Sequence, residues 1–93
     1  MIDNSAAVTY LFTDIEGSTE RWERAATHMP AAIARHDAIV DALIARHGGE
    51  VLSRAGDGVF AVFRTGNPLA CALALQLALQ AEDWSDVDGI WVR

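Results

Sequence analysis

The pattern of apolar and polar positions predicts short strands separated by helices. Residues 7–12 are rich in β-branched and aromatic side chains, a composition that suits a strand half buried in a sheet. Two more runs of this kind, at residues 50–55 and 59–63, are joined by the glycine-flanked link Gly56-Asp57-Gly58, which is typical of a hairpin. Residues 89–93 predict the beginning of another strand.

Between these strands, apolar residues recur at helical spacing. A first helix is predicted to begin at Ser18 or Thr19, either of which can cap it. The apolar pattern continues up to Pro30, which either ends this helix or begins the next. A second helical segment then continues from residue 31 to Gly48-Gly49, where a glycine in the left-handed conformation commonly stops a helix.

A third helix is predicted from residue 69 to about residue 82. Asn67 is its candidate N-cap, and Pro68 takes the first helical position. Its leucines form two neighbouring stripes, Leu69, Leu73 and Leu77 in one and Leu75 and Leu79 in the other. Residues 83–88 form a polar loop before the last predicted strand.

The order of these elements is strand, helices, strand, strand, helix, strand. Two βαβ halves joined by a central hairpin give a ferredoxin-like βαββαβ fold of the α+β class, with an antiparallel sheet and helices on one face. The last strand has barely begun when the sequence stops, so the fold is expected to be truncated at its C-terminal end. Residues 1–93 are expected to form a single domain with a thin core.

Composition and charge narrow the range of partners. The 13 acidic and 7 basic residues give a net charge of −6, which argues against a nucleic-acid partner because no basic stripe neutralises phosphates. No apolar run approaches the roughly 18 residues of a membrane span, and residues 1–5 lack the features of a signal peptide. The single cysteine, Cys71, lies among apolar residues and is predicted to be buried. We therefore expect a cytoplasmic protein without a membrane partner.

Two aspartates are the candidates for chemistry. Asp14 ends the first strand, just before a turn containing Gly17 that opens a helix, and a carboxylate next to free backbone N–H groups fits a metal-bound phosphate. Asp57 lies in the central hairpin, which neighbours the first strand in a ferredoxin-like sheet. Two converging carboxylates can hold a pair of Mg²⁺ or Mn²⁺ ions about 3.5–4 Å apart. Each aspartate alone is also a common turn residue, so the pairing carries the metal hypothesis.

Three segments together resemble a known family. The Phe-Thr-Asp-Ile-Glu-Gly-Ser-Thr run at residues 12–19, the Gly-Gly-Glu at 48–50 and the hairpin at 56–63 are similar to those of class III nucleotidyl cyclase domains, the adenylate and guanylate cyclases. The resemblance extends from residue 8 to residue 93 and is to the bacterial variety with Glu-Gly-Ser-Thr. It implies that the chain is the N-terminal part of such a domain, with a role in signal transduction.

The resemblance also implies roles for individual residues. Asp14 and Asp57 are expected to bind two Mg²⁺ or Mn²⁺ ions, with the backbone carbonyl of Ile15 as a further ligand. The triphosphate of ATP or GTP is expected to meet the N–H groups of the turn and helix start, which are those of Glu16, Gly17, Ser18 and Thr19. The ribose 3′ hydroxyl then attacks the α-phosphate, giving cyclic AMP or cyclic GMP and pyrophosphate. Because family active sites form between two domains, the expected assembly is a homodimer or a pair with another cyclase-homology domain.

Two departures from the family leave its activity open. Ser53 occupies the position of the purine-selecting lysine, and serine lacks the reach and charge of lysine. Arg54 is a poor substitute because adjacent strand residues point to opposite faces. The second base-selecting residue and the transition-state asparagine and arginine of the family lie beyond the strand that starts at Ile90. The alternatives are a nucleotidyl cyclase incomplete as given and a catalytically silent regulatory or dimerisation module.

The histidines and tryptophans have simpler interpretations. His36 and His47 are eleven residues apart on one helix, which favours buried or interface histidines over ligands of one metal. Trp22, Trp84 and Trp91 could line a base pocket, but core or interface packing is the favoured interpretation.

Overall fold

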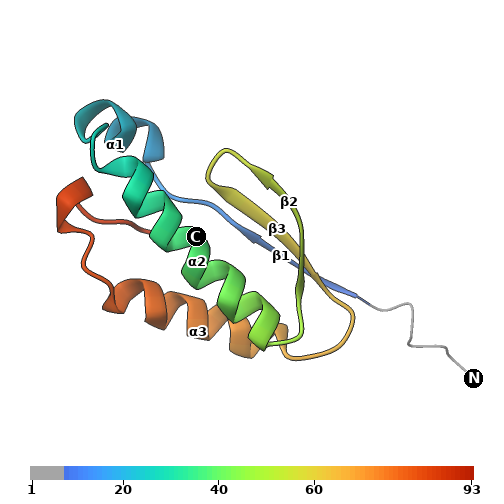
Figure 1. Cartoon of the computed structure of the whole chain (residues 1–93). Coiled ribbons are helices and arrows are strands. Elements are labelled where there is room, and N and C mark those ends of the chain that lie inside the picture. Colours follow the sequence, from blue (N-terminus) through green and yellow to red (C-terminus); the bar gives the residue numbers. More distant parts are fainter. Residues whose placement is uncertain (1–7) are drawn as a thin grey trace, which may run out of the picture.

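In the computed structural model, which describes residues 8–93, a three-stranded antiparallel sheet is covered on one face by helices (Figure 1). The elements in chain order are β1 (Thr9–Thr13), α1 (Ser18–Arg24), α2 (Met29–Arg46), β2 (Glu50–Ala55), β3 (Gly58–Phe63), α3 (Pro68–Ala81) and the 3₁₀ turn η2 (Ser85–Val87). Residue 7 of the predicted first strand and residues 1–5, where no signal peptide is predicted, lie outside the described residues.

The sheet has the order β1-β3-β2, with β3 in the centre. In the β1–β3 ladder Thr9 faces Phe63 and Thr13 faces Val59. Beyond the end of β1, Ile15 forms an antiparallel bridge with Val92, so the C-terminal segment lies on the other side of β1. This is the place of the last strand in a ferredoxin-like sheet, and the predicted α+β fold with helices on one face is confirmed.

The core lies between the sheet and helices α2 and α3. Side chains of β3 that point toward the helices are buried, because this central strand is paired on both sides and covered by both helices. The buried hydrophobic cluster consists of Ile15, Met29, Val40, Ile44, Val59, Ala61, Phe63, Cys71, Leu75, Leu79, Trp84, Val87 and Ile90. Burial raises the pKa of the Cys71 thiol, and the predicted burial of this cysteine is confirmed.

The start of α1 differs from the prediction. Its N-cap is Gly17, in the left-handed conformation with φ 65°, and no side chain caps the helix. The predicted cap by Ser18 or Thr19 is therefore wrong: Ser18 is already the first helical residue, because the chain reverses direction one residue earlier at the glycine. Of the two alternatives for Pro30, the structure has the second, since Pro30 lies in the first turn of α2.

The predicted end of α2 and the predicted start of α3 are confirmed, whereas α1 ends at Arg24 and does not continue to Pro30. Helix α2 stops in a Schellman motif in which Gly48 has φ 87° and the Gly49 N–H donates to the Ile44 carbonyl at 2.8 Å. Helix α3 begins at Pro68, and the Asn67 side chain accepts a hydrogen bond from the backbone N–H of Ala70 at 3.0 Å. None of the described helices combines the length with the apolar character that a bilayer crossing requires.

The two leucine stripes of α3 have different environments. Leu75 and Leu79 point into the core, each 3% exposed. Leu69, Leu73 and Leu77 face outward and are between 59% and 83% exposed. Helix α3 is therefore apolar on both faces, and only one of them contributes to the core.

This difference gives a matched pair of variants. We expect Leu75→Ala to lower the free energy of unfolding by about 2–5 kcal/mol, because it leaves a cavity between α3 and the sheet. Leu73→Ala, the same change on the exposed face of the same helix, is expected to stay within about 0.5 kcal/mol of the parent. Urea denaturation followed by circular dichroism measures both. Equal losses in the two variants would contradict the orientation of α3.

Candidate functional site

The register of the sheet places Asp14 and Asp57 at the same end of it. Thr13 faces Val59 in the last pair of the β1–β3 ladder, so the next residues along the two strands are Asp14 and Gly58. Gly58 directly follows Asp57, and a Cβ on this glycine would lie 3.1 Å from the Thr13 carbonyl oxygen. The hairpin turn therefore lies close against the end of β1, as expected for neighbouring strands.

The backbone after Asp14 has a defined orientation. The N–H of Glu16 donates to the carbonyl of Trp91 at 2.8 Å. In a trans peptide the C=O and N–H groups point to opposite sides, so the carbonyl of Ile15 points away from the C-terminal segment. The opposite neighbour of β1 is β3, which the hairpin precedes. The Ile15 carbonyl is thus directed to the side of the sheet where Asp57 lies.

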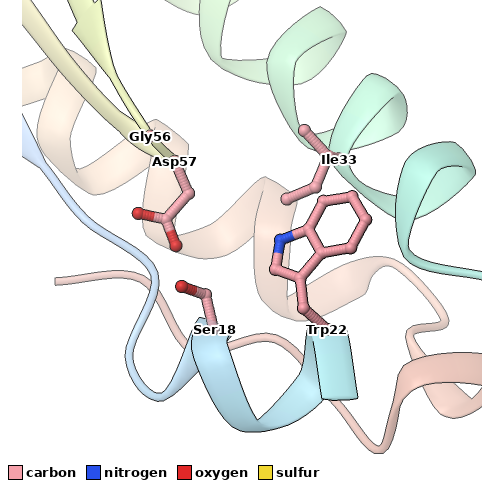
Figure 2. A pocket seen from close by; sticks show the side chains of 5 residues that line it. All are labelled: Ser18, Trp22, Ile33, Gly56 and Asp57. Carbon is pink, nitrogen blue, oxygen red and sulfur yellow. The ribbon is translucent and has the colours of Figure 1, made fainter. Parts of the chain in front are cut away.

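A cavity of about 320 Å³ adjoins this end of the sheet. It lies between α1, α2 and the hairpin and is lined by Ser18, Trp22, Ile33, Gly56 and Asp57. Figure 2 shows the Asp57 carboxylate and the Ser18 hydroxyl directed toward each other, with Trp22 and Ile33 forming an apolar wall. One carboxylate, one hydroxyl and two large apolar side chains therefore meet here.

The Asp57 carboxylate lacks part of its expected bonding. Its Oδ2 atom is buried and has no hydrogen-bond partner among the residues that the structure describes. A carboxylate oxygen removed from water without a partner costs free energy, which a bound cation would offset. Asp14 is more accessible: its carboxylate is 41% exposed and lies 3.6 Å from the Arg93 guanidinium, an ion pair that contributes little at the surface.

The donor set fits a hard cation that arrives with its substrate. Within residues 8–93 no group of three or more histidine, cysteine, aspartate or glutamate side chains could hold a metal ion. Two carboxylates and one carbonyl would leave coordination positions for phosphate oxygens and water. Mg²⁺ is commonly held in this way, by one or two carboxylates together with substrate phosphates.

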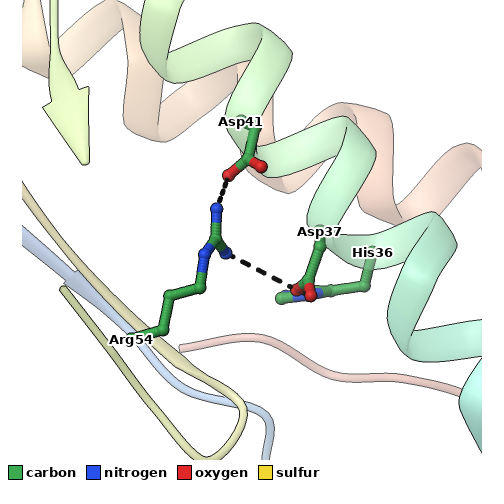
Figure 3. A network of polar contacts seen from close by, with 4 residues as sticks. All are labelled: His36, Asp37, Asp41 and Arg54. Carbon is green, nitrogen blue, oxygen red and sulfur yellow. Dashed lines mark hydrogen bonds and ion pairs between the residues drawn. The ribbon is translucent and has the colours of Figure 1, made fainter. Parts of the chain in front are cut away.

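Ser53 lies on the face of the sheet that the helices do not cover. It is opposite Phe60, which stacks with the exposed Tyr10, and paired residues share a face. Arg54 points the other way, toward α2, where it bonds to Asp41 and lies 3.9 Å from Asp37 (Figure 3). The hydrogen bond with Asp41 raises the pKa of the Arg54 guanidinium. The predicted opposite orientation of Ser53 and Arg54 is confirmed.

The histidines lie outside this site. His36 is completely buried, and its Nδ1 is 2.9 Å from a carboxylate oxygen of Asp37 (Figure 3). The Nδ1 of His47 is 2.8 Å from the Leu43 carbonyl. The prediction of a buried histidine is confirmed for His36. Together with Arg54, its partner Asp37 belongs to a polar network that ties β2 to α2 and so supports the hairpin.

The three tryptophans have different environments, and Trp91 is 58% exposed with the Arg21 guanidinium over its ring. Trp84 is 8% exposed and its indole N–H donates to the Leu79 carbonyl at 2.8 Å, as core packing predicts. Core packing is wrong for Trp22, which is 42% exposed and lines the cavity, while interface packing stays a prediction. The signal for Trp22 is its spacing: it follows Ser18 by four residues, which places both on one face of α1.

Comparison with known proteins identifies the family. The family model for the adenylate and guanylate cyclase catalytic domain matches residues 2–88. The chain belongs to this family. It is 36% identical over 80 residues to a receptor-type adenylate cyclase of Trypanosoma equiperdum, covering 83% of the chain and 17% of the relative. It is also 40% identical over 75 residues to an uncharacterized protein of Mycobacterium tuberculosis, covering 77% of the chain and 26% of that protein.

Solved structures of the family share the fold. An adenylate cyclase from Trypanosoma brucei, described in its monomeric state, superimposes with a TM-score of 0.80 and 32% identity. The match covers 89% of the chain described here and 36% of the Trypanosoma brucei chain. The chain thus spans between about a sixth and a third of the length of these relatives.

The polar network beside the hairpin can be tested by a double-mutant cycle. We expect a coupling energy between Arg54→Met and Asp41→Asn of at most about 1 kcal/mol, falling with added salt, because both side chains are more than one third exposed. Urea denaturation of the four proteins at low and high salt measures it. A coupling energy that does not respond to salt would contradict a screened ion pair.

Proposed function

We propose that this chain binds a metal–nucleoside triphosphate at the Asp14–Asp57 end of the sheet and contributes half of a class III nucleotidyl cyclase site. The observation that carries the proposal is the buried, unpartnered Oδ2 of Asp57, beside a cavity and next to the turn that follows β1. Residues 1–93 would form the N-terminal part of a single cyclase domain with a cytoplasmic signalling role.

Asp14, Asp57 and the Ile15 carbonyl would hold two Mg²⁺ or Mn²⁺ ions. Such ions, when bound, lower the barrier to attack by the ribose 3′ hydroxyl of ATP or GTP and stabilise charge on the phosphates. The chain itself positions the triphosphate through the backbone N–H groups of Gly17, Ser18 and Thr19. The N–H of Glu16, which the sequence also predicted for this role, donates to the Trp91 carbonyl at 2.8 Å instead. Trp22 and Ile33 form the apolar wall of the cavity beside the Asp57 carboxylate.

The uncovered face of the sheet supports a dimer. Tyr10 is 58% exposed and stacks on Phe60 with ring centroids 5.3 Å apart, and Phe12 is 64% exposed with its ring 5.9 Å from the same partner. Exposed aromatic clusters of this kind mark protein interfaces. Ser53 lies on this face, so a homodimer or a related cyclase domain docked there would bring Ser53 toward the nucleotide of the partner.

A silent module is the second candidate function, and the composition of the cavity favours it. None of the residues that line the cavity is basic, and the sequence contains no lysine. A cation that stabilises developing charge on the phosphates is commonly a large part of catalysis. A chain that binds the metal–nucleotide but supplies no such cation would act by regulation or dimerisation.

The metal proposal is tested by calorimetry with manganese and ATP. We expect Asp57→Asn to weaken binding of Mn²⁺–ATP by at least about tenfold, since even residues that only orient metal ligands change metal affinity by about 10- to 100-fold. Asp86→Asn, the same change at an exposed aspartate of η2, serves as the control and is expected to bind like the parent. Equal affinities in all three proteins would contradict the site.

The same proteins separate the two candidate functions. The chain is mixed with Mn²⁺, ATP or GTP, and a complete class III cyclase domain whose own two metal aspartates are replaced by asparagine. We expect cyclic AMP or cyclic GMP and pyrophosphate from this mixture, and loss of both products with Asp57→Asn. Binding of Mn²⁺–ATP without product in any mixture would favour the silent module.

Sedimentation tests whether the uncovered sheet face with Tyr10, Phe12 and Phe60 is the dimer interface. We expect Phe12→Ser to weaken self-association by about tenfold or more, because interface aromatics commonly contribute more than 1 kcal/mol. Leu73→Ser removes an exposed apolar side chain from α3 instead and is expected to leave association unchanged. The reverse outcome would place the interface on α3.

A further inference from the structure

We propose that Arg21 is the positioning residue of the site, because it fixes α1 and the turn before it to the C-terminal segment. Helix α1 has only seven residues and none of them is buried. Helices this short are unstable without tertiary contacts. Since α1 brings Ser18 and Trp22 to the cavity, an anchor other than hydrophobic burial must hold it in place.

The Arg21 guanidinium supplies that anchor through three backbone carbonyls. Its Nε donates to the Gly89 carbonyl at 2.6 Å. Its Nη1 donates to the carbonyls of Glu16 at 2.9 Å and Gly17 at 3.1 Å. The guanidinium also lies over the ring of Trp91, 5.0 Å from its centroid. One side chain thus joins α1, the turn and the C-terminal segment.

These bonds determine where the N–H groups of the turn point. A trans peptide directs its C=O and N–H to opposite sides. With the carbonyls of Glu16 and Gly17 held by Arg21, the N–H groups of Gly17 and Ser18 point away from the guanidinium and remain free for a ligand. Arg21 therefore orients the backbone of the turn and does not itself contact the ligand, since its guanidinium is bonded to the carbonyls on the opposite side of the turn.

Glycine at position 17 is required by the same arrangement. Gly17 has φ 65°, a conformation that side chains disfavour, and a Cβ there would lie 2.9 Å from the Arg21 Nη1. On the other side of the turn, the N–H of Glu16 donates to the Trp91 carbonyl at 2.8 Å. The turn is thus clamped between Arg21 and the C-terminal segment.

The functional part of this inference rests on the proposed metal–triphosphate site, so the experiment has one arm with a ligand and one without. The variants are Arg21→Gln, which removes both the charge and the planar guanidinium, and Arg21→Lys, which keeps the charge but lacks the planar set of N–H donors. Arg24→Gln, an exposed arginine of the same helix 3.9 Å from Asp88, is the matched control. Circular dichroism establishes that each variant is folded.

The arm without ligand measures amide hydrogen exchange of Glu16 by NMR. We expect exchange to be about tenfold faster in Arg21→Gln and Arg21→Lys and unchanged in Arg24→Gln, because losing a bond to a charged group costs about a factor of ten. If Glu16 exchanged in Arg21→Gln at the rate of the parent, Arg21 would not be what holds the turn to the C-terminal segment.

The arm with ligand measures binding of Mn²⁺ with inorganic tripolyphosphate by calorimetry. We expect both Arg21 variants to bind about tenfold more weakly, with Arg24→Gln like the parent. Parent-like affinity in Arg21→Lys would overturn the positioning role in favour of simple charge attraction. If the parent itself bound no tripolyphosphate, the proposed function would fail, and the positioning role of Arg21 with it. The hydrogen-exchange measurement would still show whether Arg21 holds the turn to the C-terminal segment.

Discussion

The antiparallel pairing of β1 with β3 is the constraint on which the rest of the structure depends. Side chains alternate along β1, so a slip of one residue would bring Phe12 into the core and turn Leu11 outward. The observed register buries the helix-facing side of β3, leaves an aromatic face uncovered and sets Asp14 beside the hairpin that carries Asp57. The core, the uncovered aromatic face and the candidate site therefore follow from one set of backbone hydrogen bonds.

The candidate site depends on contacts between distant parts of the sequence. The turn after β1 is held by backbone bonds to the C-terminal segment, including the reciprocal pair of Asp14 and Arg93 at 2.8 and 2.9 Å. Arg21 adds a bond to Gly89, 68 positions away. These polar contacts, rather than burial of α1, hold the backbone of the turn in place. The geometry of the turn therefore depends on its contacts with the C-terminal segment.

The sequence predicted most of the fold because local signals agree with it. The strand compositions, the Asn67 cap and the glycine stop after α2 are each decided within a few residues. The neighbouring positions of the two aspartates followed from topology. Two features could not be predicted from the sequence. At the start of α1, the backbone conformation of Gly17 took precedence over two good capping side chains. Arg21 was missed because its hydrogen bond to the Gly89 carbonyl joins residues far apart in the sequence and produces no periodic pattern.

Paramagnetic broadening by manganese tests the account most directly. Mn²⁺ with ATP, added to isotopically labelled protein, broadens the NMR signals of amides near the bound ion. We predict selective loss of the signals of Ile15, Gly17, Ser18 and Asp57, with the signal of Leu77 on the exposed face of α3 unchanged. Broadening confined to the acidic loop at residues 82–88, or spread evenly over the chain, would contradict a metal–nucleotide site between β1 and the hairpin.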